Sequence, residues 1–141
     1  GILTQQRWEA VPLRRLICDT FTAVSNDEER LNLEGPDLDL PPKVAVSLAM
    51  AIHELATNAL KYGSLSGDAG TVNIGWSTRD GRLRLRWKEQ GGPPVSEPVH
   101  RGFGSRMIER GLSAELGGRV KILFEPDGVL CDVDAPMPGD G

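Results

Sequence analysis

The residues best suited to chemistry lie in one short stretch, positions 53 to 63, which reads His-Glu-Leu-Ala-Thr-Asn-Ala-Leu-Lys-Tyr-Gly. Glu54, Asn58 and Lys61 stand at positions i, i+4 and i+7, so on a helix they fall within an arc of about 60°. Carboxylate and carboxamide oxygens suit a hard divalent cation, and an ammonium group suits phosphate oxygens. This helix edge therefore predicts a site for a divalent cation bound together with a polyphosphate.

The same helix carries an apolar stripe about a quarter turn away, formed by Leu48, Ile52, Leu55 and Ala59. A cluster of charges beside such a stripe is often no more than a solvated helix face. Here the polar edge directly flanks the stripe, and an asparagine in the middle of a helix needs a reason because it is a mediocre helix former. Residue chemistry alone leaves both interpretations open.

His53 followed by an acid resembles the start of a zinc-peptidase motif, which requires a second histidine four residues later. Position 57 is Thr, and His100, the other histidine of the chain, offers no plausible third ligand. The zinc interpretation therefore fails, and we expect His53 to be a helix residue that contacts a neighbouring loop.

Two glycine-containing motifs follow. In Trp87-Lys88-Glu89-Gln90-Gly91-Gly92, a strand ends on an acid and a glycine pair. Glu89 could accept a hydrogen bond from an exocyclic amine, and Gly91 could leave space for a flat ring, although an ordinary turn explains the motif equally well.

The second motif, Gly102-Phe103-Gly104-Ser105, precedes an expected helix. Backbone N–H groups at such a helix start can bind phosphate oxygens. The dinucleotide-binding fingerprint would need a glycine at position 107, which is Met, and a turn without any ligand remains an alternative.

The hydrophobic pattern predicts an α+β fold in which three helices pack on one face of a mixed, mostly antiparallel sheet of about five strands. The expected helices span residues 12–24, 42–62 and 104–116, and the expected strands span residues 30–34, 71–78, 82–89, 119–124 and 129–135. Residues 90–101, rich in glycine and proline, are expected to form a lid over a ligand. We expect a single domain over residues 1–141, ordered from about 8 to 136.

Bulk properties narrow the class of protein. The chain has 141 residues and a net charge of −4, so nucleic-acid binding is disfavoured. Cys18 and Cys131 show no pairing pattern, which suits a reducing compartment. No apolar run is long enough to span a membrane, so we expect a cytoplasmic domain without membrane contact. The first residue is Gly1 rather than Met, and we expect a piece of a longer protein.

The motifs His53–Gly63, Trp87–Val95 and Gly102–Arg110, in this order, resemble the ATP-binding catalytic domain of bacterial sensor histidine kinases. That domain belongs to the GHKL or Bergerat group, which includes gyrase and heat-shock chaperone ATPases. Within the kinases, His53 with Asn58 and the triplet from Trp87 to Glu89 resemble the HWE class.

The resemblance implies a role for each matched residue. Asn58 would ligate Mg²⁺, Glu54 would orient or deprotonate the acceptor group, and Lys61 would contact phosphate. Tyr62 would pack on the base or ribose of ATP, and Glu89 would bind the adenine amine. Two glycine-containing motifs of the family, its first and second glycine boxes, would border the nucleotide. The matched residues are Gly91 and Gly92 in the first box and Gly102, Gly104 and Ser105 in the second.

The implied reaction is transfer of the γ-phosphoryl group of ATP to a histidine. In this family that histidine lies on an N-terminal dimerisation domain, which the sequence does not contain, and a response regulator acts downstream. Neither His53 nor His100 resembles an acceptor, so we expect that the fragment alone does not autophosphorylate. A nucleotide-binding regulatory module without phosphotransfer, or an ATP hydrolase of the same group, stays open as an alternative.

Overall fold

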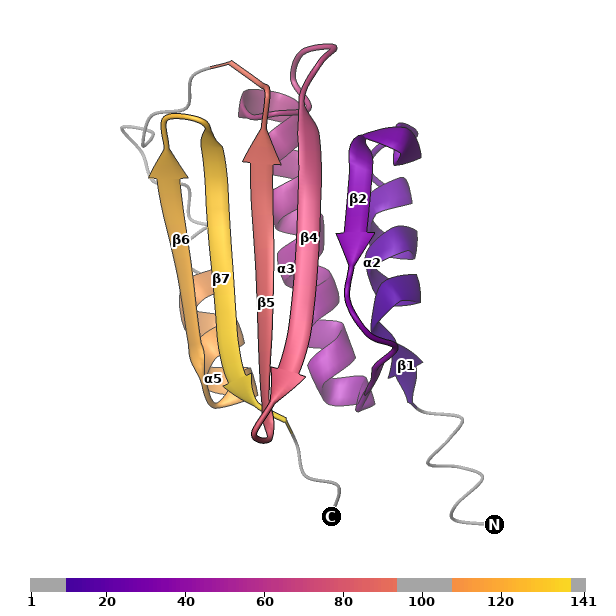
Figure 1. The fold of residues 1–141 in the computed structure, drawn as a ribbon, viewed down its shortest axis with the longest axis vertical. Helices are drawn as coiled ribbons and strands as arrows, with labels where there is room; N and C mark the ends of the chain where they lie inside the picture. The colour runs from indigo at the N-terminus through magenta and orange to yellow at the C-terminus, as the bar shows by residue number, and fades with distance from the viewer. Residues whose placement is uncertain (1–9, 94–107, 138–141) are drawn as a thin grey trace.

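The computed structural model describes residues 10–93 and 108–137. Five strands form one sheet in the order β2-β4-β5-β7-β6 (Figure 1). Their bounds are Leu31–Glu34 for β2, Thr71–Arg79 for β4, Arg82–Gln90 for β5, Gly128–Pro136 for β7 and Arg119–Glu125 for β6. Only β2 and β4 pair in parallel, and the other neighbours are antiparallel, so the predicted mixed sheet is confirmed.

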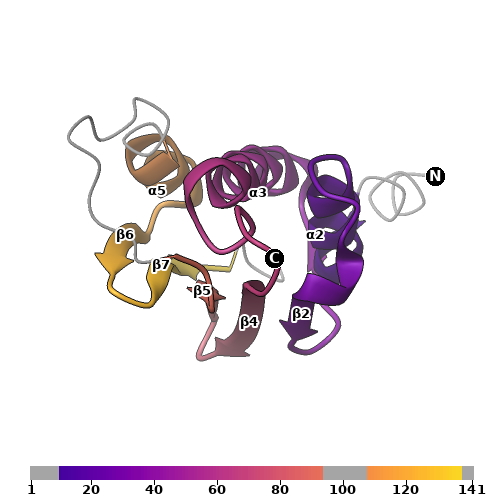
Figure 2. The same cartoon turned by 90° about the horizontal axis from the view of Figure 1, so that it is seen from above.

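The helices cover one face of this sheet, which gives the two-layer α+β fold (Figure 2). They are α2 (Leu13–Thr22), α3 (Pro42–Tyr62) and α5 (Ser113–Leu116), the last preceded by a π-helical segment, η2 (Ile108–Leu112). A 3₁₀ turn, η1 (Glu28–Arg30), leads into β2. A small ribbon pairs β1 (Val11–Pro12) with β3 (Asp39–Leu40).

The central helix α3 has the predicted bounds. Pro42 stands in its first turn, where the missing N–H costs no hydrogen bond, and Gly63 follows its last residue. The apolar stripe predicted for this helix is buried against the sheet throughout. Burial of this stripe fixes how α3 is rotated about its axis, and therefore where its polar edge lies.

Strand β5 alternates strictly between the two faces of the sheet. Leu83, Leu85 and Trp87 are buried under the helices, and the residues between them are exposed. The preceding turn at Asp80 and Gly81 has φ values of 52° and 73°, which suit a tight hairpin with the right-handed twist of the strands.

Several strands begin or end at the same edge of the sheet, the upper edge in Figure 1. Because β2 and β4 are parallel, both begin there, and β5 ends there with Gln90 opposite Thr71. The loop from Gly63 to Gly70 joins the end of α3 to the start of β4 at the same edge. The fold thus brings together the start of β2 at Leu31 and the end of β5 at Gln90, which are 59 positions apart in the sequence.

The third helix differs from the expectation of a regular α-helix over residues 104–116. Its described part begins as the π-helical η2, whose Ile108 and Leu112 are both buried, and becomes α-helical only from Ser113. Residues 104–107 lie outside the described residues. Gly117 ends α5 with a φ of 67°, a conformation that glycine adopts at little cost.

Candidate active site

The polar edge of α3 lies at the border between core and surface. Glu54 and Asn58 are half-buried, whereas Lys61 is exposed and Tyr62 is 70 % exposed. The first two side chains therefore have limited freedom, and the last two can adapt to a ligand. His53 is exposed on the same helix.

The most unusual group at this edge of the sheet is the carboxylate of Glu89, which is 1 % exposed. Its Oε1 accepts a hydrogen bond from the backbone N–H of Ser64 at 2.9 Å, and its Oε2 accepts one from the indole N–H of Trp87 at 3.0 Å. Both donors are uncharged. Trp87 and Glu89 stand two positions apart on β5, so the strand itself points both side chains to the same face.

Burial raises the pKa of Glu89 above its ordinary value, and the donated hydrogen bonds from Ser64 and Trp87 oppose that rise. Each carboxylate oxygen has a second lone pair, so Glu89 can accept a further hydrogen bond. The Ser64 hydroxyl lies close enough to lower the pKa of Glu89 but makes no well-formed hydrogen bond among the described residues. Hydrogen-bonding capacity thus remains available beside the carboxylate, which suits a polar ligand.

Glycines allow the chain segments around Glu89 to approach closely. A Cβ at Gly63 would collide with Glu89 Oε1, and one at Gly128 would collide with the Glu89 carbonyl. A Cβ at Gly92 would collide with the backbone of Ser64. The packing therefore requires glycine at these positions, whatever ligand binds.

Gly91 has a φ of 75°, which explains the glycine by backbone conformation. A Cβ there would meet the Ala69 carbonyl oxygen at 3.4 Å, an ordinary contact. Sequence reasoning assigned Gly91 to space for a ring. That role stays a prediction, and the same backbone conformation would be needed without a ring.

Sequence reasoning missed Arg30. Its guanidinium donates hydrogen bonds to the backbone carbonyl groups of Ser64, Gly67 and Gly70 at 2.9, 2.7 and 2.7 Å. An arginine before a short strand carries no distinctive pattern, so no signal in the sequence singled it out.

Three candidate residues, Gly102, Gly104 and Ser105, lie outside the described residues, together with His100 and most of the expected lid. Among residues 10–93 and 108–137, no group of three or more His, Cys, Asp or Glu side chains is arranged to hold a metal ion. Asn58 stays the protein ligand that we predict for Mg²⁺. That donor set fits the ion, which usually keeps several waters and binds ligand phosphates.

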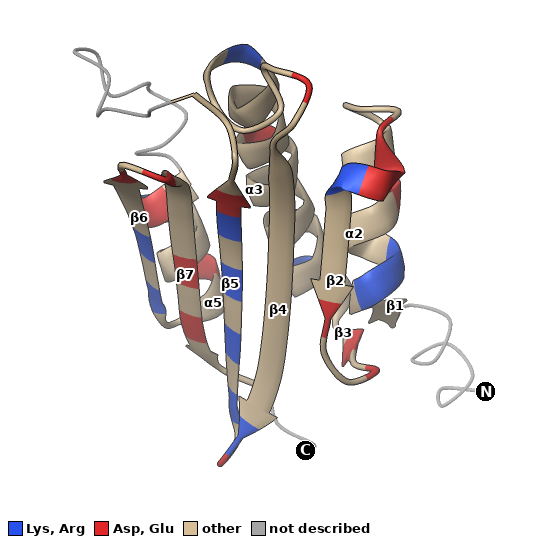
Figure 3. Cartoon of the chain, turned by 45° about the horizontal axis from the view of Figure 1, so that its top comes forward, with Lys and Arg blue, Asp and Glu red and all other residues tan. Residues whose placement is uncertain are grey.

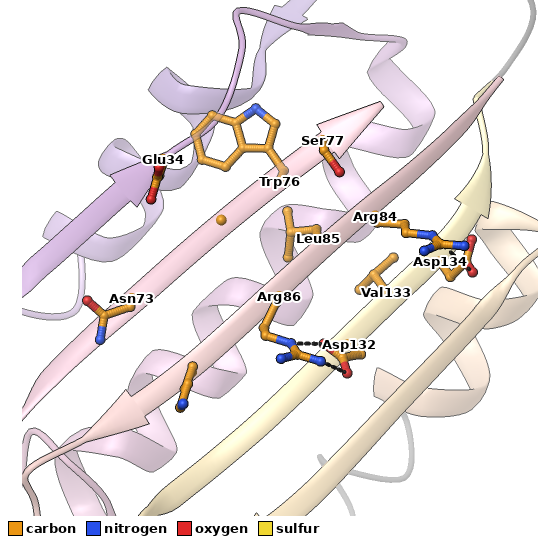
Figure 4. Close-up of a pocket in the computed structure, with 12 residues that line it drawn as sticks. Glu34, Asn73, Trp76, Ser77, Arg84, Leu85, Arg86, Asp132, Val133 and Asp134 are labelled. Atoms are coloured by element: carbon orange, nitrogen blue, oxygen red, sulfur yellow. Dashed lines mark hydrogen bonds and ion pairs between the residues drawn. The ribbon is translucent and has the colours of Figure 1, made fainter. Parts of the chain in front are cut away.

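Three cavities are lined by described residues that do not include Asn58 or Glu54. The largest, about 760 Å³, is an open trough on the helix-free face of the sheet (Figure 4). Half of its twelve lining residues are charged, and among these Arg86 pairs with Asp132 and Arg84 with Asp134. It lies on the opposite side of the sheet from α3.

Within the described part of the chain, no helix has the length and apolar character needed to cross a membrane.

Comparison with known proteins gives a consistent picture. No protein-family model matches the chain. The chain is 41 % identical over 145 residues to a blue-light-activated histidine kinase of Brucella anthropi and 37 % identical over 142 residues to one of Brucella ovis. These alignments cover 99 % and 96 % of the chain but 29 % of each relative, so the chain spans less than a third of their length.

Solved structures show the same fold. The histidine kinase domain of the Erythrobacter litoralis blue-light-activated histidine kinase aligns with a TM-score of 0.73 at 24 % identity, over 90 % of this chain and 62 % of that one. The histidine kinase domain of the Escherichia coli osmosensor EnvZ aligns with a TM-score of 0.64 at 16 % identity, over 94 % and 91 %. The chain is therefore similar in sequence to part of two blue-light-activated histidine kinases and has the fold of histidine kinase domains.

Proposed function

We propose that the domain binds Mg-ATP where α3 and β5 end, and that it supports transfer of the γ-phosphoryl group to a histidine outside this chain. The observation that carries the proposal is the Glu89 carboxylate. It is buried without a cationic partner among the described residues and keeps unused lone pairs. It also lies against Gly63, which directly follows the helix that carries the acid, amide and ammonium groups. In a histidine kinase catalytic domain, that combination suits adenine at one end and phosphates at the other.

In this proposal each residue of the chain has a defined task. Glu89 accepts a hydrogen bond from the adenine amine, and Tyr62 packs on the base or ribose. Asn58 holds Mg²⁺ through its carboxamide oxygen, Lys61 contacts phosphate, and Glu54 orients or deprotonates the acceptor. When bound, Mg²⁺ would neutralise charge on the transferred phosphoryl group.

The glycines of the two boxes, Gly91 and Gly92 with Gly102, Gly104 and Ser105, would border the nucleotide. We also propose that the parent kinase contributes a dimerisation domain with the acceptor histidine, passes phosphate on to a response regulator, and works in the bacterial cytoplasm. Catalysis would rest on positioning and charge neutralisation, because phosphoryl transfer needs little covalent chemistry from the protein.

Calorimetric titration with ATP, with and without Mg²⁺, tests the proposal. Asn58→Ala is expected to abolish Mg²⁺-dependent affinity and leave the fold intact, because Asn58 lies off the buried stripe of α3. Asn32→Ala is the matched control, since Asn32 is exposed on β2 and pairs only with Asn73 in the described structure. Equal ATP affinity in wild type and Asn58→Ala would remove Asn58 as the metal ligand, and no binding by wild type would refute the function.

A further inference from the structure

The segment from Gly63 to Gly70, hereafter the α3–β4 loop, has no regular secondary structure and is nevertheless held at many points. Arg30 makes three of these contacts, to carbonyl oxygens spread across the loop. Its side chain is only 15 % exposed, and Asp27 balances its charge at 3.4 Å. A half-buried arginine that donates to three carbonyl groups restrains the loop strongly, because hydrogen bonds from a charged donor are stronger than those between neutral groups.

Ser64 is the point where this restraint reaches the candidate site. The backbone carbonyl of Ser64 accepts from Arg30, and its backbone N–H donates to Glu89 Oε1. Gly92 packs directly on the Ser64 backbone. A shift of Ser64 would therefore move the donor that orients the Glu89 carboxylate and the surface on which the glycine pair rests.

We propose that Arg30 is a positioning residue for the base-binding half of the nucleotide site, and that it acts through Ser64 on Glu89. Arg30 does not itself touch the nucleotide. This inference rests on the proposed function, and it adds a residue from η1, more than 30 positions before Ser64, to the set that determines adenine affinity.

Arginine is the residue type that this task requires. Its planar guanidinium presents five N–H donors in a fixed fork, so one side chain can serve three separate carbonyl groups. Lysine would supply a similar charge from a single point on a flexible stem. Arg30→Lys is thus expected to keep the charge and lose the restraint.

The experiment uses the full chain and compares two ligands, Mg-ATP and Mg-tripolyphosphate, by calorimetry. Arg30→Gln is expected to weaken Mg-ATP about tenfold or more, as loss of charged hydrogen bonds implies. Mg-tripolyphosphate lacks the base, so its affinity is expected to stay within about twofold of wild type, a change too small to reflect loss of one hydrogen bond. An equal loss for both ligands would show a general structural effect and overturn the inference.

Arg14→Gln is the matched control. Arg14 also donates to a backbone carbonyl, that of Gly35 at 2.6 Å, and its guanidinium lies 5.0 Å from the Trp76 ring centroid, both far from Glu89 along the strands. Its removal is expected to lower stability without changing the affinity for Mg-ATP relative to that for Mg-tripolyphosphate. If Arg14→Gln weakened Mg-ATP selectively as well, the assignment to Arg30 would be wrong.

A second measurement keeps the inference testable if Arg30→Gln folds poorly. In Arg30→Lys, amide hydrogen exchange at Ser64 is expected to be faster than in wild type. The loss of Mg-ATP affinity caused by Arg30→Lys is expected to be smaller in a chain that already carries Glu89→Gln. Unchanged exchange at Ser64, or fully additive losses, would contradict the inference. Failure of the wild-type chain to bind Mg-ATP would instead refute the proposed function itself.

Discussion

The two faces of the sheet hold carboxylates in opposite ways. On the helix-covered face, Glu89 of β5 is buried and bonded to two uncharged N–H donors. On the open face, Asp132 and Asp134 of β7 are partly exposed and paired with arginines of β5, and Figure 3 shows the red bands of β7 beside the blue bands of β5. The same strand pair thus carries both arrangements, back to back.

The pKa values of the carboxylates on the two faces are shifted in opposite directions. Burial raises the pKa of Glu89, whereas the hydrogen bond from Arg82 lowers that of Asp134. An exposed carboxylate next to arginines is already neutralised and offers little to a ligand. A buried carboxylate without a cation among the described residues remains an acceptor for a neutral donor such as an amine, so the covered face is the one suited to recognition.

The largest expected effect comes from filling space on each face. Gly63→Ala is expected to lower the free energy of unfolding by about 1–3 kcal/mol, because its Cβ would collide with a Glu89 carboxylate that two donors hold in place. On the open face, a Cβ at Gly75 would meet only the Glu34 carbonyl oxygen at 3.6 Å. Gly75→Ala is therefore expected to stabilise by about 0.5–1 kcal/mol. Urea unfolding measures both, and similar losses would break the comparison.

A somewhat smaller effect is expected for Trp87→Phe, which keeps an aromatic ring in the core and removes one donor to Glu89. We expect a loss of about 1–2 kcal/mol and a further rise in the pKa of Glu89. Trp76→Phe is the control, because its indole N–H donates to the Pro36 carbonyl at 2.7 Å instead. Carboxyl NMR titration distinguishes them: the Glu89 pKa should change only in Trp87→Phe.

The dependence of stability on pH separates the two carboxylates further. Because the folded-state pKa of Glu89 is raised, its contribution falls as pH rises from about 4.3 through that pKa, with a slope of at most about 1.4 kcal/mol per pH unit. Glu89→Gln removes this slope, so its stability relative to wild type should improve with rising pH.

Asp134 has a lowered pKa, so its contribution is present above its ordinary pKa and is lost as pH falls through the lowered one. Asp134→Asn should therefore approach wild-type stability at low pH. Urea unfolding at several pH values checks both variants. Parallel pH profiles for wild type and Glu89→Gln would show that Glu89 has no raised pKa.

The smallest effect is expected for Arg86→Ala. The ion pair of Arg86 with Asp132, at 2.7 Å, is exposed to solvent and screened by salt. We expect a change below about 1 kcal/mol in the free energy of unfolding and unaltered Mg-ATP affinity. A large loss of affinity would place the ligand on the open face and refute the assignment to the covered one.

The sequence predicted the regular elements well, because their signals are local. The helix predicted at residues 42–62 and the strands predicted at 71–78 and 82–89 lie within one residue of the observed α3, β4 and β5. The π-helical turn at Ile108–Leu112 was not predicted, because a widened helical turn has nearly the same apolar period as an α-helix.

The candidate site was predictable only in part. The type of Glu89 and its place at a strand end suggested an acceptor for an amine, but its hydrogen bond to Ser64 depends on a loop whose position is set by distant contacts. Arg30 acts on backbone carbonyl groups, which are the same in every residue, so no pairing of side-chain types could reveal it. The role of the glycines as close-packing positions likewise required coordinates.

The pairing of Cys131 with Trp87 across β7 and β5 has a practical consequence. Burial raises the pKa of Cys131 to about 12, so its thiol is neutral at physiological pH and shielded from reagents. After replacement of Cys18 by serine, maleimide would modify the chain only when these strands separate. The labelling rate would then measure the rate at which the sheet opens. A slower rate in the presence of an added nucleotide would show how much binding stabilises the closed sheet.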